Sequence, residues 1–421
     1  MRKDFQSRFL KILSVDVLVK GGGFLLLPVY LQLMTAEEFG RYSYLFSIAG
    51  MFAYVFGMGQ HISLSRFFHT NEYTRKEVVG NIHLVLFTSV VVFLSILLTF
   101  KTQLISLMFK HEVLDTTYYI VISLAILLVL NQIFMVFLYQ SEQISFVQKK
   151  NIFDFLCVNI VTILALYFID YAADVVRITS MFVAYIVIIV FYYRLPGLAS
   201  IFSTRLTTSI YKRFLINGTP VAVGSFANFF IAFGDRFVVE KLLDESKLGV
   251  FSFAIIITSI IMVVFNSFQN IWLPFLFKEK DLNISFKRIY KIIILFAAVS
   301  AVAGAIFYLL VYVLANNFID KVYLSSLEFL WILVIAVFFQ TAGMFIAGFY
   351  QIFEKNYISM PVNIGAAGIN IALNYYLIAQ YQLRGAAIAT ALISFMLFLI
   401  HFTLVHYYKN KGSYGEYFSG N

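Results

Sequence analysis

The chain has 421 residues, of which 61% are hydrophobic and 13% are charged, and its formal net charge is +9. A soluble domain carries about 25% charged residues, so this composition excludes an ordinary soluble protein and indicates one that crosses a membrane many times. The single cysteine, Cys157, excludes an internal disulfide and a cysteine-based metal site.

The first apolar stretch, residues 9–34, is long enough to span a bilayer, yet it carries Asp16, Lys20, three glycines at 21–23 and Pro28. Basic residues precede it without a small-residue cleavage site, which indicates an uncleaved anchor. Charges near a bilayer centre are costly and point to function. The i, i+4 spacing favours an ion pair between Asp16 and Lys20. The glycines and the proline weaken the helix beyond that pair, as in transporter substrate sites. A neutralised pair with close glycine packing is the alternative interpretation.

Apolar runs of about 20 residues predict twelve membrane-spanning helices. They lie at 9–33, 42–60, 81–100, 117–140, 152–169, 175–193, 214–239, 249–275, 289–314, 325–350, 358–379 and 385–407. With a cytoplasmic N-terminus, 21 of the 31 Lys and Arg residues fall in inward segments and 8 in outward loops. This bias predicts that both termini are cytoplasmic. Topology thus explains the basic charge, and we expect no nucleic-acid partner.

An internal repeat relates two short segments of the chain, residues 33–48 and 242–257. At a constant offset of 209 residues, Gly40 aligns with Gly249, and Ser43 with Ser252. Half of the chain is about 210 residues, so the offset predicts a duplicated six-span unit. We therefore predict an N-terminal six-helix bundle at 1–208 and a C-terminal six-helix bundle at 209–421, with the same orientation in the membrane.

The repeat makes the seventh predicted span, 214–239, the counterpart of the first. This span contains Gly218 and Pro220, which predict a break in the helix, and the ionisable pair Asp235–Arg236. Interrupted spans in corresponding halves are a pointer to a transport site. We expect Lys20 near the bilayer midplane and Arg236 near the outer end of its span. The alternative is an interfacial pair whose side chains snorkel to the outer face.

Three segments carry a resemblance to a known family: 25–48, 57–68 and 233–254. They resemble the polysaccharide-transport branch of the multidrug/oligosaccharidyl-lipid/polysaccharide exporter superfamily, and more narrowly the Wzx-type O-antigen flippases. The most specific pieces are a Leu-x-x-x-Glu-Glu-Phe-Gly-x-Tyr-Ser motif beginning at Leu33 and the Gly-Asp-Arg-Phe segment beginning at Gly234. The resemblance implies an all-α polytopic protein of the bacterial inner (cytoplasmic) membrane, with two six-helix bundles around a central cavity.

The resemblance also implies a function. Such a protein is a flippase that moves an undecaprenyl-diphosphate-linked oligosaccharide from the cytoplasmic to the periplasmic leaflet by alternating access. Besides this glycan and the membrane lipids, a polysaccharide polymerase and a chain-length regulator would be its partners. No cofactor is implied, although transport could be coupled to a proton or sodium gradient.

A diphosphate head is anionic, so we expect fixed cations along its path. We select Lys20 and Arg236 as such cations within the predicted spans, and Arg66, which follows the second span, as a cation at the cytoplasmic mouth. The planar guanidinium fork suits a diphosphate. Asp16 would neutralise Lys20, take up a coupling proton or bind a cation, and Asp235 would pair with Arg236. Many Asn and Gln residues in the spans indicate a hydrated interior or hydrogen bonds between helices.

Two other functions remain open on the sequence. A drug or cation antiporter of the same superfamily would share the fold and would use an acidic residue of the first span for coupling. A membrane polysaccharide polymerase would be an enzyme, which usually needs a long outward loop or a carboxylate cluster. The chain shows neither of these, and no Walker motif, His/Cys metal spacing or nucleophile elbow, so we predict a protein that is not an enzyme.

Overall fold

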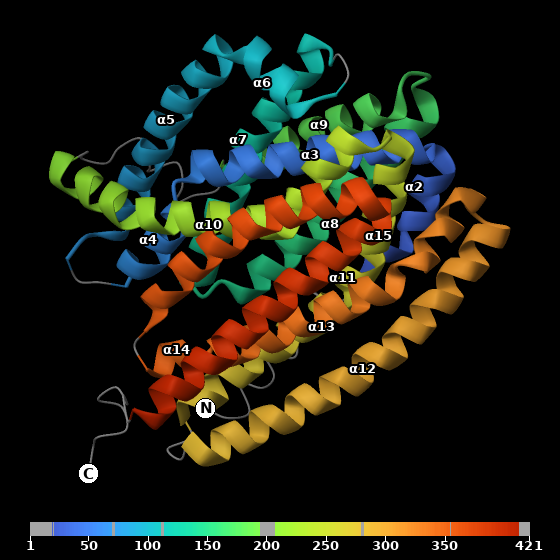
Figure 1. The fold of residues 1–421 in the computed structure, drawn as a ribbon. Coiled ribbons are helices and arrows are strands. Elements are labelled where there is room, and N and C mark those ends of the chain that lie inside the picture. The colour runs from blue at the N-terminus through green and yellow to red at the C-terminus, as the bar shows by residue number, and fades with distance from the viewer. Residues whose placement is uncertain are drawn as a thin grey trace. The chain divides into compact units, whose positions relative to one another are not determined.

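Figure 1 shows a computed structural model of the chain, which describes residues 19, 21–69, 72–110, 113–193, 207–278, 282–353 and 355–411. In these ranges the regular structure is helical. The α-helices are α2 (Leu27–Leu33), α3 (Ala36–Gly57), α4 (Gln60–Phe67), α5 (Arg75–Thr99), α6 (Lys101–Met108), α7 (Asp115–Gln140), α8 (Ile144–Phe168), α9 (Ala173–Tyr193), α10 (Thr208–Leu242), α11 (Glu245–Lys278), α12 (Leu282–Asn317), α13 (Leu330–Ala347), α14 (Phe349–Ile352) and α15 (Ser359–Asn410). Two short 3-10 helices, η2 (Lys321–Glu328) and η3 (Asn356–Ile358), join them.

These helices confirm the predicted all-α polytopic fold. Among the described residues, nine helices are long and apolar enough to cross a membrane, and the bent pair α3–α4 makes a tenth. The longest, α15, merges two helices at Gln382, where the backbone leaves the helical region. With the shorter apolar helix Gly21–Leu33, each of the twelve predicted spans has a helical counterpart.

Matching caps begin the two helices of the repeat. Thr35 and Glu38 hydrogen-bond reciprocally at the start of α3: the Thr35 main-chain N–H donates to the Glu38 carboxylate at 2.9 Å, and the Glu38 N–H donates to the Thr35 hydroxyl at 3.2 Å. At the start of α11, the Asp244 carboxylate accepts from the Lys247 N–H at 2.7 Å. Such caps satisfy main-chain donors that the first helical turn leaves unpaired. Thr35 and Asp244 are also 209 residues apart.

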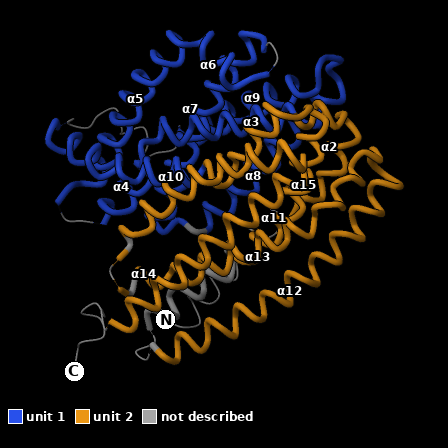
Figure 2. Tube along the Cα trace, viewed as in Figure 1, with its two compact units in different colours: residues 1–19, 41–229 blue, residues 20–40, 230–421 orange. Residues whose placement is uncertain are grey.

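The helices form two compact units, which Figure 2 shows in blue and orange. Unit 1 comprises residues 1–19 and 41–229, and unit 2 comprises 20–40 and 230–421. The division passes through α3 and α10. The predicted halves 1–208 and 209–421 concern the duplication of the sequence, whereas the two units describe how contacts group in the folded chain. The halves therefore remain a prediction.

Aromatic side chains fill much of the interior of each unit. In unit 1, the rings of Phe134 on α7 and Tyr192 on α9 stack with centroids 5.0 Å apart. In unit 2, the rings of Phe265 on α11 and Phe345 on α13 pack with centroids 4.2 Å apart. Such pairs add about 0.5–1.5 kcal/mol each beyond the area that they bury.

The helix break near Gly218 was predicted in the wrong element. α10 runs from Thr208 to Leu242 with Pro220 inside it. The break lies instead between α3 and α4, which meet at 48°. Met58 and Gly59 have positive φ values there, of 43° and 64°. A proline within a helix removes one main-chain hydrogen bond. The helix can continue through it where neighbouring groups satisfy the carbonyl that is left.

Glycine serves close packing at this point rather than flexibility. A Cβ added to Gly218 would lie 2.2 Å from the Met58 carbonyl oxygen, and one added to Gly59 would lie 2.3 Å from the Gly218 carbonyl oxygen. The Gln60 side-chain amide donates to the carbonyl oxygens of Met58 and Phe214, at 3.0 and 3.2 Å. The broken second span therefore packs against α10 through two facing glycines and the hydrogen bonds of one buried glutamine.

The first span is interrupted only mildly in its described part. The glycines at 21–23 are helical, Leu26 forms a turn, and α2 resumes at Leu27 with Pro28 in its first turn. A proline in the first helical turn removes no intrahelical hydrogen bond, and its fixed φ suits that position. The predicted weak point is thus a restart of the helix just beyond the glycines.

Candidate functional site

A cavity of about 320 Å³ lies inside unit 2, between α10, α11, α13 and α15. Most of its lining is aliphatic or aromatic. Its polar residues are Asp235, Arg236, Thr258, Ser259, Gln340, Thr390 and Ser394. A mostly apolar cavity with a few convergent polar groups is typical of a ligand site, and this cavity contains the pair that the sequence analysis selected.

Asp235 and Arg236 are both buried, with 3% and 6% of their surfaces exposed. The Asp235 carboxylate accepts a hydrogen bond from the Arg236 main-chain N–H at 2.7 Å. The Arg236 guanidinium lies 4.7 Å from the centroid of the Phe233 ring, in a cation–π contact. The snorkelling interpretation required these side chains to extend to the surface. The pair instead faces the interior of unit 2.

The hydroxyl groups of this cavity present mainly acceptor oxygens. Thr258, Thr390 and Ser394 each donate to a main-chain carbonyl four residues earlier in the same helix, at 3.0, 3.0 and 2.8 Å. A hydroxyl has one proton to donate and two lone pairs to accept with. The cavity wall thus combines hydroxyl oxygens and one carboxylate with the guanidinium of Arg236 and the side-chain amide of Gln340.

Two buried asparagines on α15 hold the turn of α10 that precedes Asp235. The Asn370 side chain donates to the carbonyl oxygens of Phe230 and Ile231, at 3.3 and 3.0 Å. Asn374, one turn later, donates to the Asn370 carbonyl at 2.9 Å. Asn370 is 2% exposed and Asn374 is 0% exposed. The hydrogen bonds of Asn370 therefore join α15 to α10 at this turn.

Arg66 lies in unit 1, in the last turn of α4, with its side chain exposed. Its guanidinium donates to the side-chain oxygen of Asn217 on α10 at 2.8 Å. Asn217 in turn donates to the main-chain carbonyl of Arg213 at 2.9 Å. In the described part of the chain, the polar partner of Arg66 is thus a neutral amide, which leaves its positive charge uncompensated.

Arg213 lies on α10, one turn before Asn217, and its environment differs from that of Arg66. Its guanidinium donates to the Glu72 carboxylate at 2.5 Å and to the Tyr73 hydroxyl at 2.7 Å. The Glu72 carboxylate compensates its charge, so Arg213 is less suited than Arg66 to hold an anionic ligand. The two arginines therefore offer a matched comparison within unit 1.

Lys20 and Asp16 lie outside the described residues, so their predicted roles remain predictions. A charged pair in unit 1, Lys150 and Asp154, was not predicted as a site from the sequence. The fifth span was predicted to begin at residue 152, whereas α8 begins at Ile144 and places Lys150 inside the helix with 1% of its surface exposed. An acidic residue four positions after the lysine, within the apolar run, was the signal that could have identified it.

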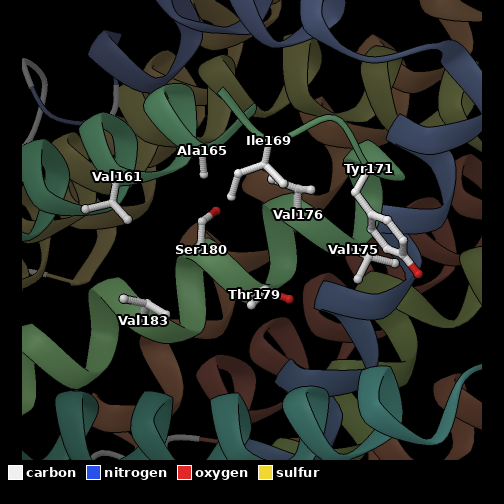
Figure 3. A pocket seen from close by; sticks show the side chains of 9 residues that line it. All are labelled: Val161, Ala165, Ile169, Tyr171, Val175, Val176, Thr179, Ser180 and Val183. Atoms are coloured by element: carbon white, nitrogen blue, oxygen red, sulfur yellow. The ribbon is translucent and has the colours of Figure 1, made fainter. Parts of the chain in front are cut away.

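A second cavity, of about 380 Å³, lies between α8 and α9 in unit 1 (Figure 3). Its lining is aliphatic apart from Tyr171, Thr179 and Ser180. The Ser180 hydroxyl already donates to the Arg177 carbonyl at 2.9 Å. Because this lining has no charged group and few polar ones, we do not take this cavity as the candidate site.

The part of the chain that the structure describes has no obvious metal-binding site. No group of three or more His, Cys, Asp and Glu side chains is arranged there to hold a metal ion. The half-buried Asp154 carboxylate pairs with Lys150, and the buried Asp235 carboxylate accepts from the Arg236 main-chain N–H.

Comparison with known proteins now decides the family. Residues 8–280 match the family described as "Polysaccharide biosynthesis protein", which is well over half of the chain. The chain belongs to this family. No curated protein matches the chain. The family assignment agrees with the resemblance seen in the sequence.

Solved structures establish the fold of this polysaccharide biosynthesis family member. An inward-facing multidrug resistance MATE family transporter of the MOP superfamily matches with a TM-score of 0.65 and 15% identity, over 94% of this chain and 97% of that chain. A MATE transporter of Vibrio cholerae matches with a TM-score of 0.64 and 13% identity, over 99% and 98%. An outward-facing MATE transporter matches at 0.61 and 16%, over 95% and 94%. At these identities the likeness shows a shared transporter fold, and the protein is a multi-pass membrane protein.

Proposed function

We propose that this protein is a flippase for a lipid-linked oligosaccharide in the bacterial inner membrane. It would move an undecaprenyl-diphosphate-linked repeat unit of the O-antigen type from the cytoplasmic to the periplasmic leaflet by alternating access. The observation that carries the proposal is the combination of a polysaccharide biosynthesis family with a transporter fold. A family member that is a transporter is expected to move a polysaccharide precursor.

The cations of the chain suit this substrate. Arg66 has an exposed guanidinium held by a neutral amide, so its charge is available to a diphosphate at the cytoplasmic mouth. Arg236 would contact the anion further along the path, and Lys20 would do so near the midplane. A guanidinium binds phosphate oxygens in a bidentate manner, which gives both affinity and orientation.

The carboxylates would neutralise nearby cations or couple transport to an ion gradient. Asp16 would pair with Lys20, and Asp235 would balance Arg236 or take up a proton or sodium ion as the protein changes state. A polysaccharide polymerase and a chain-length regulator would consume the flipped unit on the periplasmic side.

One observation favours a second candidate, a proton- or sodium-coupled multidrug antiporter. The cavity of unit 2 is rich in acceptor oxygens around a buried carboxylate, which is an environment for a cation. This candidate shares the fold, and the same oxygens would serve a coupling ion in a flippase.

Deleting the gene in the source organism tests the proposal. A flippase predicts loss of the long-chain polysaccharide, with full-length lipid-linked units accumulating on the cytoplasmic side. Accumulation of unpolymerised units on the periplasmic side would mean a polymerase. Unchanged polysaccharide with greater sensitivity to cationic drugs would mean an antiporter. Restoring the gene on a plasmid is the control.

A further inference from the structure

Lys150 is a fully buried lysine in unit 1. It lies in α8, with 1% of its residue surface and 0% of its side chain exposed, whereas the neighbouring Lys149 is exposed. A buried ammonium group is very costly unless other groups replace its water shell. The surroundings of this side chain therefore have to supply that replacement.

Three helices supply it. Asp154, one turn along α8, lies within hydrogen-bond distance of the Lys150 ammonium. From α7, the side-chain oxygen of Asn131 accepts a hydrogen bond at 2.6 Å, and the Phe134 ring centroid lies 5.8 Å away. From α9, the Tyr192 ring centroid lies 5.0 Å away. We call these four residues, Asn131, Phe134, Asp154 and Tyr192, the ammonium cage.

The ammonium cage has the chemistry of a cation site. It combines a carboxylate oxygen, an amide oxygen and two aromatic faces, and each of these groups attracts a positive charge. Its members come from α7, α8 and α9, so they meet only when the three helices are packed. The positive charge inside the cage comes from the chain itself.

We propose that Lys150 acts as a tethered ammonium ion that permanently occupies a cation cage in unit 1. The charge joins α7, α8 and α9, and it keeps the Asp154 carboxylate neutralised without an external proton or metal ion. Any ion coupling of transport then has to use other carboxylates of the chain, such as Asp235 in unit 2. This inference concerns unit 1 by itself and stands whichever substrate the protein moves.

A simple packing role makes a different prediction. If the lysine stem merely filled space, any neutral side chain or solute of similar length would serve as well. If the charge matters, removing it leaves the half-buried Asp154 carboxylate uncompensated, and only a cation can replace it. The two roles are therefore distinguished by whether a replacement group must carry a positive charge, and not by its volume.

The test uses the full-length protein in detergent, with thermal unfolding as the readout. Lys150→Ala retains Cβ and removes the remaining four heavy atoms, which n-propylammonium matches in length. We expect the melting temperature to fall by about 5 °C, because removing one partner of a buried pair leaves the other charge uncompensated. We expect n-propylammonium to restore at least half of the loss and n-propanol to restore none of it.

Matched variants keep the result interpretable. Lys149→Ala, at the exposed neighbouring lysine, should change neither the melting temperature nor its response to n-propylammonium. The double variant Lys150→Met/Asp154→Asn, which removes both charges, should be more stable than Lys150→Ala. Equal rescue by n-propanol, or a melting temperature unchanged in Lys150→Ala, would overturn the proposal. None of these readouts depends on transport, so the flippase proposal is tested separately.

Discussion

Gly40 and Gly249 are 209 residues apart in the sequence and lie against each other in unit 2. A Cβ added to Gly40 would lie 2.1 Å from the Glu245 carbonyl oxygen, and one added to Gly249 would lie 1.9 Å from the Ala36 carbonyl oxygen. Ala36 and Glu245 are also 209 residues apart. The contact is thus reciprocal: the first turns of α3 and α11 touch through equivalent atoms, as two copies related by an axis would.

This contact predicts the effect of adding a methyl group. Gly249→Ala places a carbon where no carbon fits, so the two helices have to separate. We expect a loss of about 1–3 kcal/mol in the free energy of unfolding, measured as a lower melting temperature in detergent. Gly365→Ala is the control, because a Cβ there meets nothing within 4 Å. Equal stability of Gly249→Ala and the wild type would contradict the close approach.

The same contact predicts coupling between the two glycines. Once one substitution has separated the helices, the second methyl group finds part of the space that it needs. The double variant Gly40→Ala/Gly249→Ala should therefore lose less stability than the sum of the two single losses, by at least about 0.5 kcal/mol. Strict additivity would mean that the two positions act independently.

Arg66 is predicted to act through its charge and its shape. Arg66→Ala should reduce transport by at least about tenfold, since a charge-assisted bond to a ligand is worth about 1.5–3 kcal/mol. Arg66→Lys should retain part of the activity, because lysine keeps the charge without the planar fork. The measurement is flipping of a lipid-linked oligosaccharide in vesicles, corrected for protein amount.

Arg384→Ala is the matched control for this prediction. Arg384 is also exposed, but its guanidinium lies 3.0 Å from the Glu328 carboxylate, so its charge is already compensated. Its loss should leave transport within about twofold, as surface ion pairs contribute little. If both alanine variants lowered flipping equally, Arg66 would have no special role.

The Asp235–Arg236 pair predicts a pattern across three variants. Asp235→Asn removes one of the two buried charges of this pair, and Arg236→Gln removes the other. Each single variant should lose about 3–5 kcal/mol of stability, while the double variant should recover much of this loss. Thermal unfolding measures stability, and vesicle assays with and without a proton or sodium gradient measure coupling. A double variant less stable than both single variants would argue against charge balance.

Asn370 is predicted to position the α10 turn that precedes Asp235. Asn370→Ala removes donors to the Phe230 and Ile231 carbonyls and should cost about 1–3 kcal/mol. Asn316→Ala is the control, since the exposed Asn316 side chain donates to the Tyr312 carbonyl of its own helix. Hydrogen exchange of α10 should increase in the first variant and stay unchanged in the second. Unchanged exchange in both would remove the positioning role.

The sequence allowed the spans to be predicted because a bilayer imposes one length on every crossing helix. It did not allow the helix ends to be placed, since polar first turns continue the helix beyond the apolar run. For this reason Lys150 was assigned to a loop although it lies inside α8. Its burial depends on Asn131 and Tyr192, which come from other helices, and local pattern carries no information about such partners.

The break in the second span shows a second limit of local reasoning. Gly218 and Pro220 are strong helix breakers by propensity, but α10 continues through both, because tertiary context overrides local propensity. The positive φ of Met58 is unfavourable by itself and is retained where Gly59 packs against Gly218. By contrast, Asp235 and Arg236 could be selected from the sequence, because charges within an apolar run are costly in a membrane and are kept where they are paired or functional.

The single residue that separates the two arms of α15 has a consequence for how the protein enters the membrane. The chain turns back at Gln382, where φ is 52°, and Figure 1 shows both arms of α15 leading from this turn toward the end of unit 2 where α14 lies. A Cβ on Gly385 would lie 2.0 Å from the Leu377 carbonyl oxygen, so the turn is closed tightly. With almost no polar loop to carry across, the two arms of α15 can partition into the bilayer together as a preformed hairpin, in one step.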